Sequence, residues 1–365
     1  MNALDLAAAT LVCLPQVTPA RLRLLLDEFD GPLGALTAVR AGRAAEALAR
    51  GVRRDPAEDA SLALRWRDVV DPDAIARQLT RRGTRVWREG TVDYPIRDEL
   101  SDRPPVLLAE GAEPQVLRRP RVAVVGTRAA TPHGLADARE LGAFLAGAGV
   151  TVVSGMAIGI DGAVHEGALG AGGAAVGVVA TGLDVEYPRR HVALYDRVRH
   201  AGLVLGETGF GVRPAAPRFP VRNRIIAALA DVVVVVEATV RGGARITAQY
   251  GLDYGRLVMA VPGSRRNAAA GGTNELIADG AHPLVDWSDV LLALGMTPGA
   301  RRGSEARPAP GADGTALLRA LGGEAATPDQ LAGRTGMTPE RVALAIVELE
   351  RAGWTERAHG CVWPR

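Results

Sequence analysis

Glycine, hydroxyl and arginine residues follow short apolar stretches of this sequence, and residues of these types can hold phosphate. Gly126, Thr127 and Arg128 come directly after the apolar residues 122–125. A second stretch, "SGMAIGIDG" at 154–162, places glycines ahead of a helix-like segment. Backbone amides and the positive end of a helix dipole can bind an anion at such a turn. Neither stretch matches G-x-G-x-x-G or G-x-x-x-x-G-K-[ST], so the residues indicate an anion site of another kind.

Arginines near these loops help to decide between phosphate binding and simple close packing. Glycines alone could merely allow a strand and a helix to approach each other. Three glycine-containing loops at one sheet edge, with arginines nearby in sequence, favour phosphate. Each arginine counts for less than usual, because the chain has no lysine and all 43 basic residues are arginine. The arginines concerned are Arg128, Arg189, Arg222, Arg224 and Arg241.

Catalytic groups are harder to find in the same loops. Asp161 and His165 share a helix at i, i+4, a spacing that could support a catalytic pair but more often gives a local hydrogen bond. Glu207 and Glu237 end apolar stretches, where burial could raise a carboxyl pKa, but the many arginines favour ion pairs. We expect Glu207 to order the "FPVRNR" segment at 219–224. No HExxH, CxxC or Walker lysine is present, so the sequence predicts no catalytic site, metal or cofactor.

Apolar strand patterns alternate with helix patterns from residue 121 to about 294. Near-continuous Val, Ala and Leu runs separated by helices predict an α/β fold with a doubly wound, mostly parallel sheet buried on both faces. Ligands of such sheets bind beyond the carboxyl ends of the strands. The expected strands are 122–126, 150–155, 174–180, 203–207, 232–238 and 257–263, and the expected helices are 132–147, 161–170, 191–200, 222–230, 244–254 and 273–280.

Smaller segments flank this core on both sides. Residues 1–83 predict a small helical domain, in which "LPQVTPARLRLLL" loosely resembles a helix-hairpin-helix turn with Pro15 and Thr18 in place of its glycines. The core domain, 84–298, opens with a partly extended bridge that ends at residue 120. Residues 299–314 have the composition of a flexible linker, and 315–365 predict a winged-helix domain.

Composition sets outer bounds on the function. The chain has 365 residues, 47% hydrophobic content and a formal net charge of +2, so any basic surface must be local. Cys13 and Cys361 lack metal-ligand spacing and form no disulfide framework, which favours a reducing cytoplasm. No apolar run approaches the length of a membrane span. The first residues carry Asp5 and no basic region, unlike a signal peptide.

The strand-end motifs together resemble one known family, DNA-processing protein A, also called DprA or Smf. The similarity rests on "VAVVGTR", "SGMAIGIDGAVHEGAL", "TGLDVEYPRR", "FPVRNRIIAALAD", "GGARITAQYGLDYGR" and "AVPG…GGTNELIADGA", in that order. It covers about 120–285 closely and the flanking domains more loosely. The sequence departs from the family pattern at Gly206, at Gly242–Gly243 and at Arg245, and these positions bear on contacts at the rim of the site.

The resemblance implies a Rossmann-like core that binds single-stranded DNA without base specificity. It also implies a homodimer formed through that core, delivery of RecA to DNA during natural transformation or recombination, and no chemical reaction or cofactor. The residues implied to hold the DNA backbone are Gly126, Thr127, Arg128, Ser154, Gly155, Ala157, Gly159, Asp161, Arg222, Asn223, Arg224 and, more loosely, Arg189.

Aromatic residues make up only 4% of the chain, so we expect phosphate contacts to dominate and binding to depend steeply on salt. Phe210 and Phe219 lie near the loops and either could stack a base, with burial in the core favoured for Phe219. Two alternatives stay open. One is a nucleoside-monophosphate phosphoribohydrolase with Glu275 as its catalytic carboxylate, and the other is a transcription-related adaptor acting through the winged helix.

Overall fold

The chain forms two compact units, Met1–Thr297 and Pro298–Arg365. The computed structural model describes residues 2–51, 56–96, 100, 102–297, 308–358 and 360–364. Among these residues, no helix combines the length and apolarity needed to cross a bilayer. The N-terminal helices group with the sheet in the first unit, and most of the expected linker lies outside the described residues.

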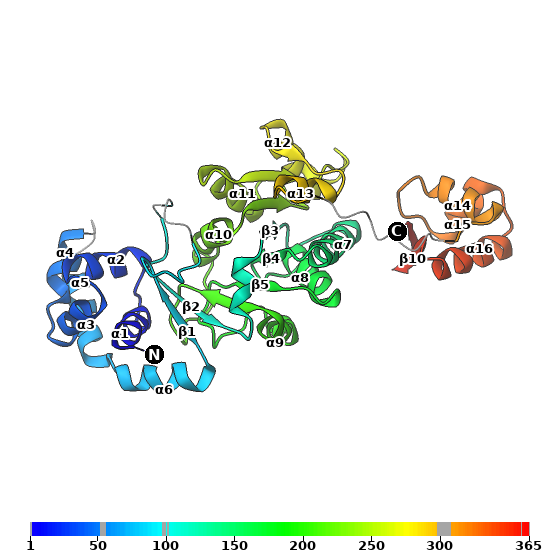
Figure 1. The fold of residues 1–365 in the computed structure, drawn as a ribbon. Coiled ribbons are helices and arrows are strands. Elements are labelled where there is room, and N and C mark those ends of the chain that lie inside the picture. Colours follow the sequence, from blue (N-terminus) through cyan, green and yellow to red (C-terminus); the bar gives the residue numbers. More distant parts are fainter. Residues whose placement is uncertain are drawn as a thin grey trace. The chain divides into compact units, whose positions relative to one another are not determined.

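A nine-stranded sheet forms the centre of the first unit, in the order β1-β2-β6-β5-β4-β3-β7-β8-β9 (Figure 1). From β6 to β9 neighbouring strands are parallel, which confirms the predicted doubly wound sheet. The strands are β1 (Arg85–Arg88), β2 (Val106–Glu110), β3 (Arg121–Val125), β4 (Thr151–Ser154), β5 (Ala175–Val178), β6 (Leu203–Gly206), β7 (Val232–Val235), β8 (Leu257–Ala260) and β9 (His282–Pro283).

The predicted bridge between residues 84 and 120 is more regular than expected. It supplies two antiparallel strands, of which β2 pairs with β6 and β1 pairs with β2. All five residues of β2 are buried. Pro95, Pro104 and Pro105 lie in the connection between the two strands, whereas β1 carries charged residues at both of its ends.

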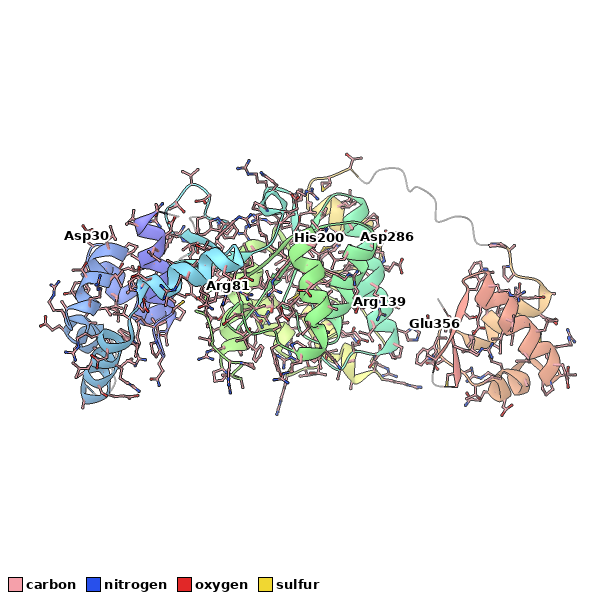
Figure 2. The ribbon with its side chains drawn as sticks, turned by 90° about the horizontal axis from the view of Figure 1, so that it is seen from below. Asp30, Arg81, Arg139, His200, Asp286 and Glu356 are labelled. Atoms are coloured by element: carbon pink, nitrogen blue, oxygen red, sulfur yellow. The ribbon has the colours of Figure 1, made fainter. Side chains whose placement is uncertain are left out.

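Helices cover both faces of the sheet, which explains why its strands are apolar on both sides. Val122 and Val124 of β3 pack in a cluster with α7 and α8, whereas Ala123 and Val125 pack in a cluster with α10 and α11. The helices are α7 (Pro132–Gly147), α8 (Ile160–Gly170), α9 (Val192–Ala201), α10 (Arg218–Leu229), α11 (Gly243–Asp253), α12 (Gly271–Ala278) and α13 (Ser288–Ala293). Figure 2 shows Arg139 and His200 extending outward from α7 and α9.

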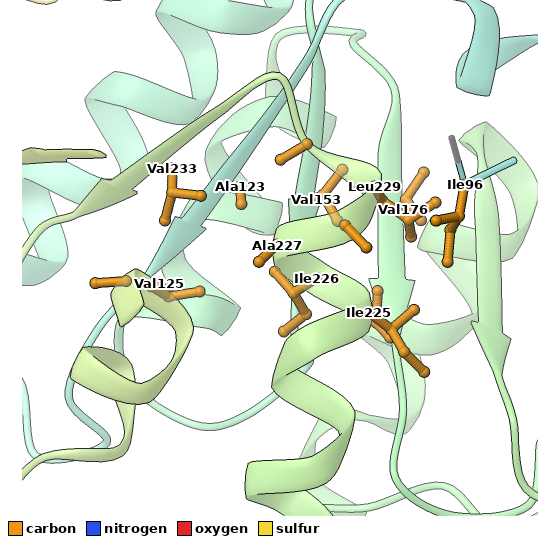
Figure 3. Packing of buried hydrophobic residues seen from close by; sticks show 14 of the residues in the cluster. Ile96, Ala123, Val125, Val153, Val176, Ile225, Ile226, Ala227, Leu229 and Val233 are labelled. Carbon is orange, nitrogen blue, oxygen red and sulfur yellow. The ribbon is translucent and has the colours of Figure 1, made fainter. Parts of the chain in front are cut away.

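Helix α10 positions part of the candidate site. Figure 3 shows its residues Ile225, Ile226 and Leu229 packed toward the sheet, beside Val153 and Val176. The helix begins at Arg218, four residues before the predicted start, so the "RFPVRN" residues, 218–223, form its first turns. Burial of the apolar residues 225–229 therefore fixes the position of residues 218–223.

Six helices precede the sheet and pack against it. They share an apolar cluster with β2, β6 and α9. Trp66 is fully buried and its Nε1 donates to the Pro15 carbonyl at 2.7 Å, while the Arg82 Nε donates to Glu110 at 2.6 Å. The helices are α1 (Ala3–Val12), α2 (Pro19–Glu28), α3 (Pro32–Arg40), α4 (Ala44–Gly51), α5 (Pro56–Val69) and α6 (Pro72–Arg82).

The described residues of the second unit form three helices and a two-stranded sheet. Thr327 and Gln330 form a capping box at the start of α15, which matches the Thr-Pro signal in the sequence. The first helix begins three residues before the expected domain boundary. The elements are α14 (Ala312–Leu321), α15 (Pro328–Thr335), α16 (Pro339–Arg351), β10 (Thr355–Ala358) and β11 (Cys361–Pro364).

Candidate nucleic-acid interface

A cavity of about 510 Å³ opens beyond the carboxyl ends of β3 and β7. Strand order reverses between these two strands, and such a switch point is where doubly wound sheets bind ligands. Loops from five strand ends contribute to it, while the loop after β8 does not. The lining residues are 125–128, Ala157, Asp161, Tyr187, 214–216, Phe219, Pro220, Arg222, Asn223, Ile226, 242–244 and Thr247.

Close packing holds the turn after β3 at the cavity wall. A Cβ at Gly126 would lie 2.4 Å from Ile160 Cγ1 and 2.9 Å from the Glu237 carbonyl oxygen, so only glycine fits. The Thr127 N–H donates to that same carbonyl at 2.7 Å. Gly159 has φ +83°, and a Cβ there would lie 2.3 Å from the Thr127 carbonyl oxygen. The turn therefore has a defined conformation.

The start of α7 is already occupied by an internal anion. The Glu237 carboxylate accepts from the Thr131 N–H at 2.9 Å and from the Thr131 hydroxyl at 2.6 Å. A Cβ at Gly134 would lie 2.3 Å from the same carboxylate. The first helix after the first parallel strand is where a dinucleotide fold receives pyrophosphate. Glu237 takes that place, which gives a physical reason for the missing glycine fingerprint.

Arg128 is the exposed cation of the cavity wall. Its guanidinium carbon lies 4.8 Å from the centre of the Phe219 ring, a cation–π distance. The Phe219 ring in turn lies 5.8 Å from the ring of Tyr187. Burial of Phe219 in the core, which the sequence favoured, is therefore wrong. Phe219 is half-buried at the cavity, whereas Phe210 packs with the N-terminal helices.

Arg222 reaches the cavity as an internally bonded cation. Its side chain is buried, and Nη1 donates to the Gly155 carbonyl at 2.7 Å and to the Val178 carbonyl. Burial lowers the Arg222 pKa, although the nearby Asp161 opposes that shift. A Cβ at Gly155 would lie 2.4 Å from the guanidinium. Arg222 thus joins the loops after β4 and β5.

The amides of the loop after β4 are used within the protein. Asp161 Oδ2 accepts from the Gly155 N–H at 3.1 Å and from the Ala157 N–H at 3.3 Å. Burial raises the Asp161 pKa, while Arg222 and these N–H groups act to lower it. The Ser154 hydroxyl is buried and donates to the Val124 carbonyl at 2.6 Å. The loop therefore shapes the cavity but presents few donors to it.

The expectation that Glu207 orders the "FPVRNR" segment is confirmed. Arg224 Nη2 donates to Glu207 Oε2 at 2.5 Å, and Arg224 Nε lies 3.3 Å from Asp102 Oδ2. Arg224 is buried and lies outside the cavity lining. Its neighbour Asn223 does line the cavity, and the Asn223 amide donates to the Gly243 carbonyl at 3.2 Å.

The remaining predicted residues lie outside the cavity lining. Arg189 and Arg241 are exposed, and neither belongs to the wall. Gly242 and Gly243, which depart from the family pattern, do line it, because α11 begins there without a side-chain cap among the described residues. Its first amides and dipole therefore favour an anion at this wall, a feature that sequence reasoning missed.

Arg245 and Glu275 form an ion pair at the surface, away from the cavity lining. The glutamate that a phosphoribohydrolase would require is therefore engaged elsewhere. Sequence reasoning also missed Tyr187 and the 214–216 segment as parts of the wall. The only available signal was their place after strand ends.

Most of the chain is similar to proteins of one known family. Residues 85–295 match the model of the family described as DNA recombination-mediator protein A. The chain belongs to this family. Residues 303–360 match the model of the DprA winged helix domain. Protein Smf of Escherichia coli K12 is 36% identical over 273 residues, which cover 71% of each chain, and a DprA protein of Mycobacterium tuberculosis is 37% identical over 90% of this chain and 87% of its own.

Two solved structures of the family resemble large parts of this chain. The DprA structure from Streptococcus pneumoniae has 30% sequence identity and a TM-score of 0.66, covering 80% of this chain and 98% of that one. A structure of DNA processing protein A from Helicobacter pylori, whose subject is its single-stranded DNA binding mode, has 28% identity and a TM-score of 0.52. It covers 58% of this chain and 95% of that one.

Proposed function

We propose that the cavity beyond β3 and β7 binds single-stranded DNA without sequence preference in its main contacts. The observation that carries this proposal is that the exposed Arg128 and the start of α11, which has no side-chain cap, line the same cavity. A guanidinium and helix-terminal amides together suit a backbone phosphate. The single-stranded DNA binding mode of the Helicobacter pylori relative supports the same ligand.

Aromatic rings beside the cation add a contact for the bases. Phe219 and Tyr187 both line the cavity, and stacking on an aromatic ring accepts any base because every base has a π-face. The Arg128 guanidinium lies over one face of the Phe219 ring. We expect Arg128 to turn toward a phosphate on binding and a base to take its place on the ring.

The winged helix is a poor candidate for the main DNA site. Residues 308–358 and 360–364 carry seven acidic residues and five arginines. Arg341 pairs with Asp313 at 2.6 Å and Arg357 pairs with Glu350 at 2.9 Å, so part of its positive charge is neutralised internally. Attraction to phosphate requires uncompensated charge. The proposal therefore places DNA binding in the core.

The cellular role proposed is that of a mediator, without a chemical step, in the cytoplasm. The protein would protect single strands and load RecA onto them during natural transformation or homologous recombination, acting as a homodimer formed through the core. Membership of the family supports this role. RecA filament formation on single strands should be faster with the full chain present. A measurement of molar mass in solution gives the oligomeric state.

The central test is DNA binding as a function of salt for the wild type and Arg128→Ala. We expect weaker binding and a slope of log K against log salt that is shallower by about one, because one phosphate contact is lost. Arg139→Ala is the matched control, since Arg139 is an exposed arginine on α7 outside the cavity. Unchanged affinity in Arg128→Ala would remove the basis of the proposal.

The enzymatic alternative has its own test. Incubation with nucleoside monophosphates should release no free base, because Glu275 is paired with Arg245 outside the cavity. Turnover that disappears in Glu275→Gln would favour the phosphoribohydrolase instead.

A further inference from the structure

A second cavity, of about 470 Å³, lies between the N-terminal helices and the core. Its volume falls in the range of pockets that hold small ligands. Val17 and Leu22 contribute apolar wall from the helical side, and Val106, Val179 and Val212 contribute it from the core. Its occupant must therefore have an apolar body.

The cations that line this cavity are already bonded within the protein. Arg21 donates to the Gln16 carbonyl at 3.1 Å and to Asp59 at 3.0 Å, and it is buried. Arg222, which also lines the first cavity, donates to two backbone carbonyls. Of these two, only Arg21 is paired with a carboxylate. Arg218, the third arginine in the lining, is exposed and donates to the Arg213 carbonyl at 2.7 Å.

Glu207 is the acidic residue in the lining of this cavity. Oε2 of Glu207 accepts from Arg224, whereas Oε1 accepts from no residue that the structure describes. Burial raises the Glu207 pKa, and Arg224 opposes that shift. A ligand here should therefore bring an N–H donor to the carboxylate, together with its apolar body.

We propose that this cavity is a second nucleobase site, which accepts bases with an exocyclic amino group. Adenine, cytosine and guanine carry such a group, and a glutamate accepts from the cytosine amino group in known base recognition. Thymine has no exocyclic amino group, and its N3–H lies between two carbonyl oxygens that a carboxylate repels, so thymine is disfavoured. The inference deepens the proposed function and rests on it.

Continuity with the first cavity argues for a base rather than another amine. Arg222 lines both cavities, Phe219 lines the first and Val221 lines the second. The first turn of α10 thus separates them, and a helix with its side chains is about 10 Å across. One strand can therefore place a base in each cavity. The N-terminal helices would then take part in DNA binding.

The test compares binding of cytosine and thymine oligomers of equal length, about 12 nucleotides. We expect the wild type to bind the cytosine oligomer at least about tenfold more tightly, the contribution of one hydrogen bond to a carboxylate. Val17→Trp fills the cavity from the helical side and should abolish the preference while keeping thymine binding. Val92→Trp, at an exposed position outside both cavities, should behave as the wild type.

Each outcome has a defined meaning. Equal binding of the two oligomers by the wild type, or a preference that survives in a folded Val17→Trp, overturns the second site. Val212→Trp fills the same cavity from the core if Val17→Trp does not fold. Calorimetry with free dCMP and dTMP distinguishes a base of the DNA strand from a free nucleotide as the ligand. If the wild type shows no oligomer preference but binds dCMP, and Val17→Trp abolishes that binding, the cavity is a site for free nucleotides. If neither oligomer binds, the proposed function fails, and the absence of dCMP binding then overturns this site as well.

Discussion

Arg224 and Glu207 form a buried ion pair, with 2.5 Å between Nη2 and Oε2, that ties the first half of α10 to the end of β6. Asp102 lies 3.3 Å from the same guanidinium. The two residues that precede Arg224 in sequence, Arg222 and Asn223, line the first cavity. The pair therefore sets the position of residues that it does not itself include.

Loss of this carboxylate should be costly. Glu207→Ala leaves the buried Arg224 without its closest partner, and breaking a buried pair costs about 3–5 kcal/mol of unfolding free energy. Glu166→Ala is the control, because its pair with Arg139 is exposed and should contribute about 0–1 kcal/mol. Urea unfolding measures both. Similar losses in the two variants would contradict the structural role given to Glu207.

Gly159 should be required for both stability and DNA binding. Gly159→Ala combines a positive φ with a Cβ that would lie 2.3 Å from the Thr127 carbonyl oxygen, so the turn that carries Arg128 must shift. We expect lower stability and weaker binding. Gly147→Ala is the control, since nothing lies within 4 Å of its Cβ at the end of α7. Wild-type DNA affinity in Gly159→Ala would show that the turn tolerates displacement.

The contributions of Phe219 and Arg128 to DNA binding should differ in their dependence on salt. Phe219→Ala removes a stacking surface, which is worth about 1–3 kcal/mol per base, but removes no charge. Its affinity should fall while its salt slope stays that of the wild type, in contrast to the shallower slope of Arg128→Ala. Fluorescence titrations at several salt concentrations give both quantities. A shallower slope in Phe219→Ala would mean that the ring instead holds Arg128 in place.

His165 should make stability fall in mild acid. Burial and the nearby His191 lower its pKa to about 3, from an ordinary value near 6.5, and a backbone hydrogen bond at Ser154 offsets only part of that shift. Between pH 6.5 and pH 3, His165 therefore binds a proton in the unfolded chain but not in the folded chain. The stability present above pH 6.5 is lost as pH falls toward 3.

Between pH 7 and pH 5 the wild type should lose about 2 kcal/mol more than His165→Leu. Unfolding by urea at the two pH values measures this difference. His200→Leu, which alters an exposed histidine on α9, should retain the wild-type dependence. An identical pH profile for all three proteins would contradict a neutral, buried His165.

The parallel strands and their helices were predictable because their patterns are local. A run such as 232–235 is buried on both faces and so contains only valine, and the expected 132–147 helix has the bounds of α7. The antiparallel strands β1 and β2 were less visible. Their role depends on pairing with β6, a partner about a hundred residues away, which no local pattern encodes.

The sequence indicated where the candidate site lies in the fold, but it indicated fewer of the contacts within it. Glycine after a strand reveals close approach, and the structure shows that approach at Gly126. Sequence does not reveal which group fills the space, so the capture of the 155–157 amides by Asp161 was not foreseen. The contrast between Phe219 and Phe210 depends in the same way on three-dimensional neighbours.

The Glu237 carboxylate at the start of α7 also bears on which molecules compete for this protein in a cell. The pyrophosphates of nicotinamide and flavin dinucleotides bind at the start of the first helix in folds of this kind. Here they would meet a like charge that is already bonded to that helix. We therefore expect the metabolite pool to leave the protein unoccupied, so that its loading with DNA follows the supply of single strands and not the metabolic state of the cell.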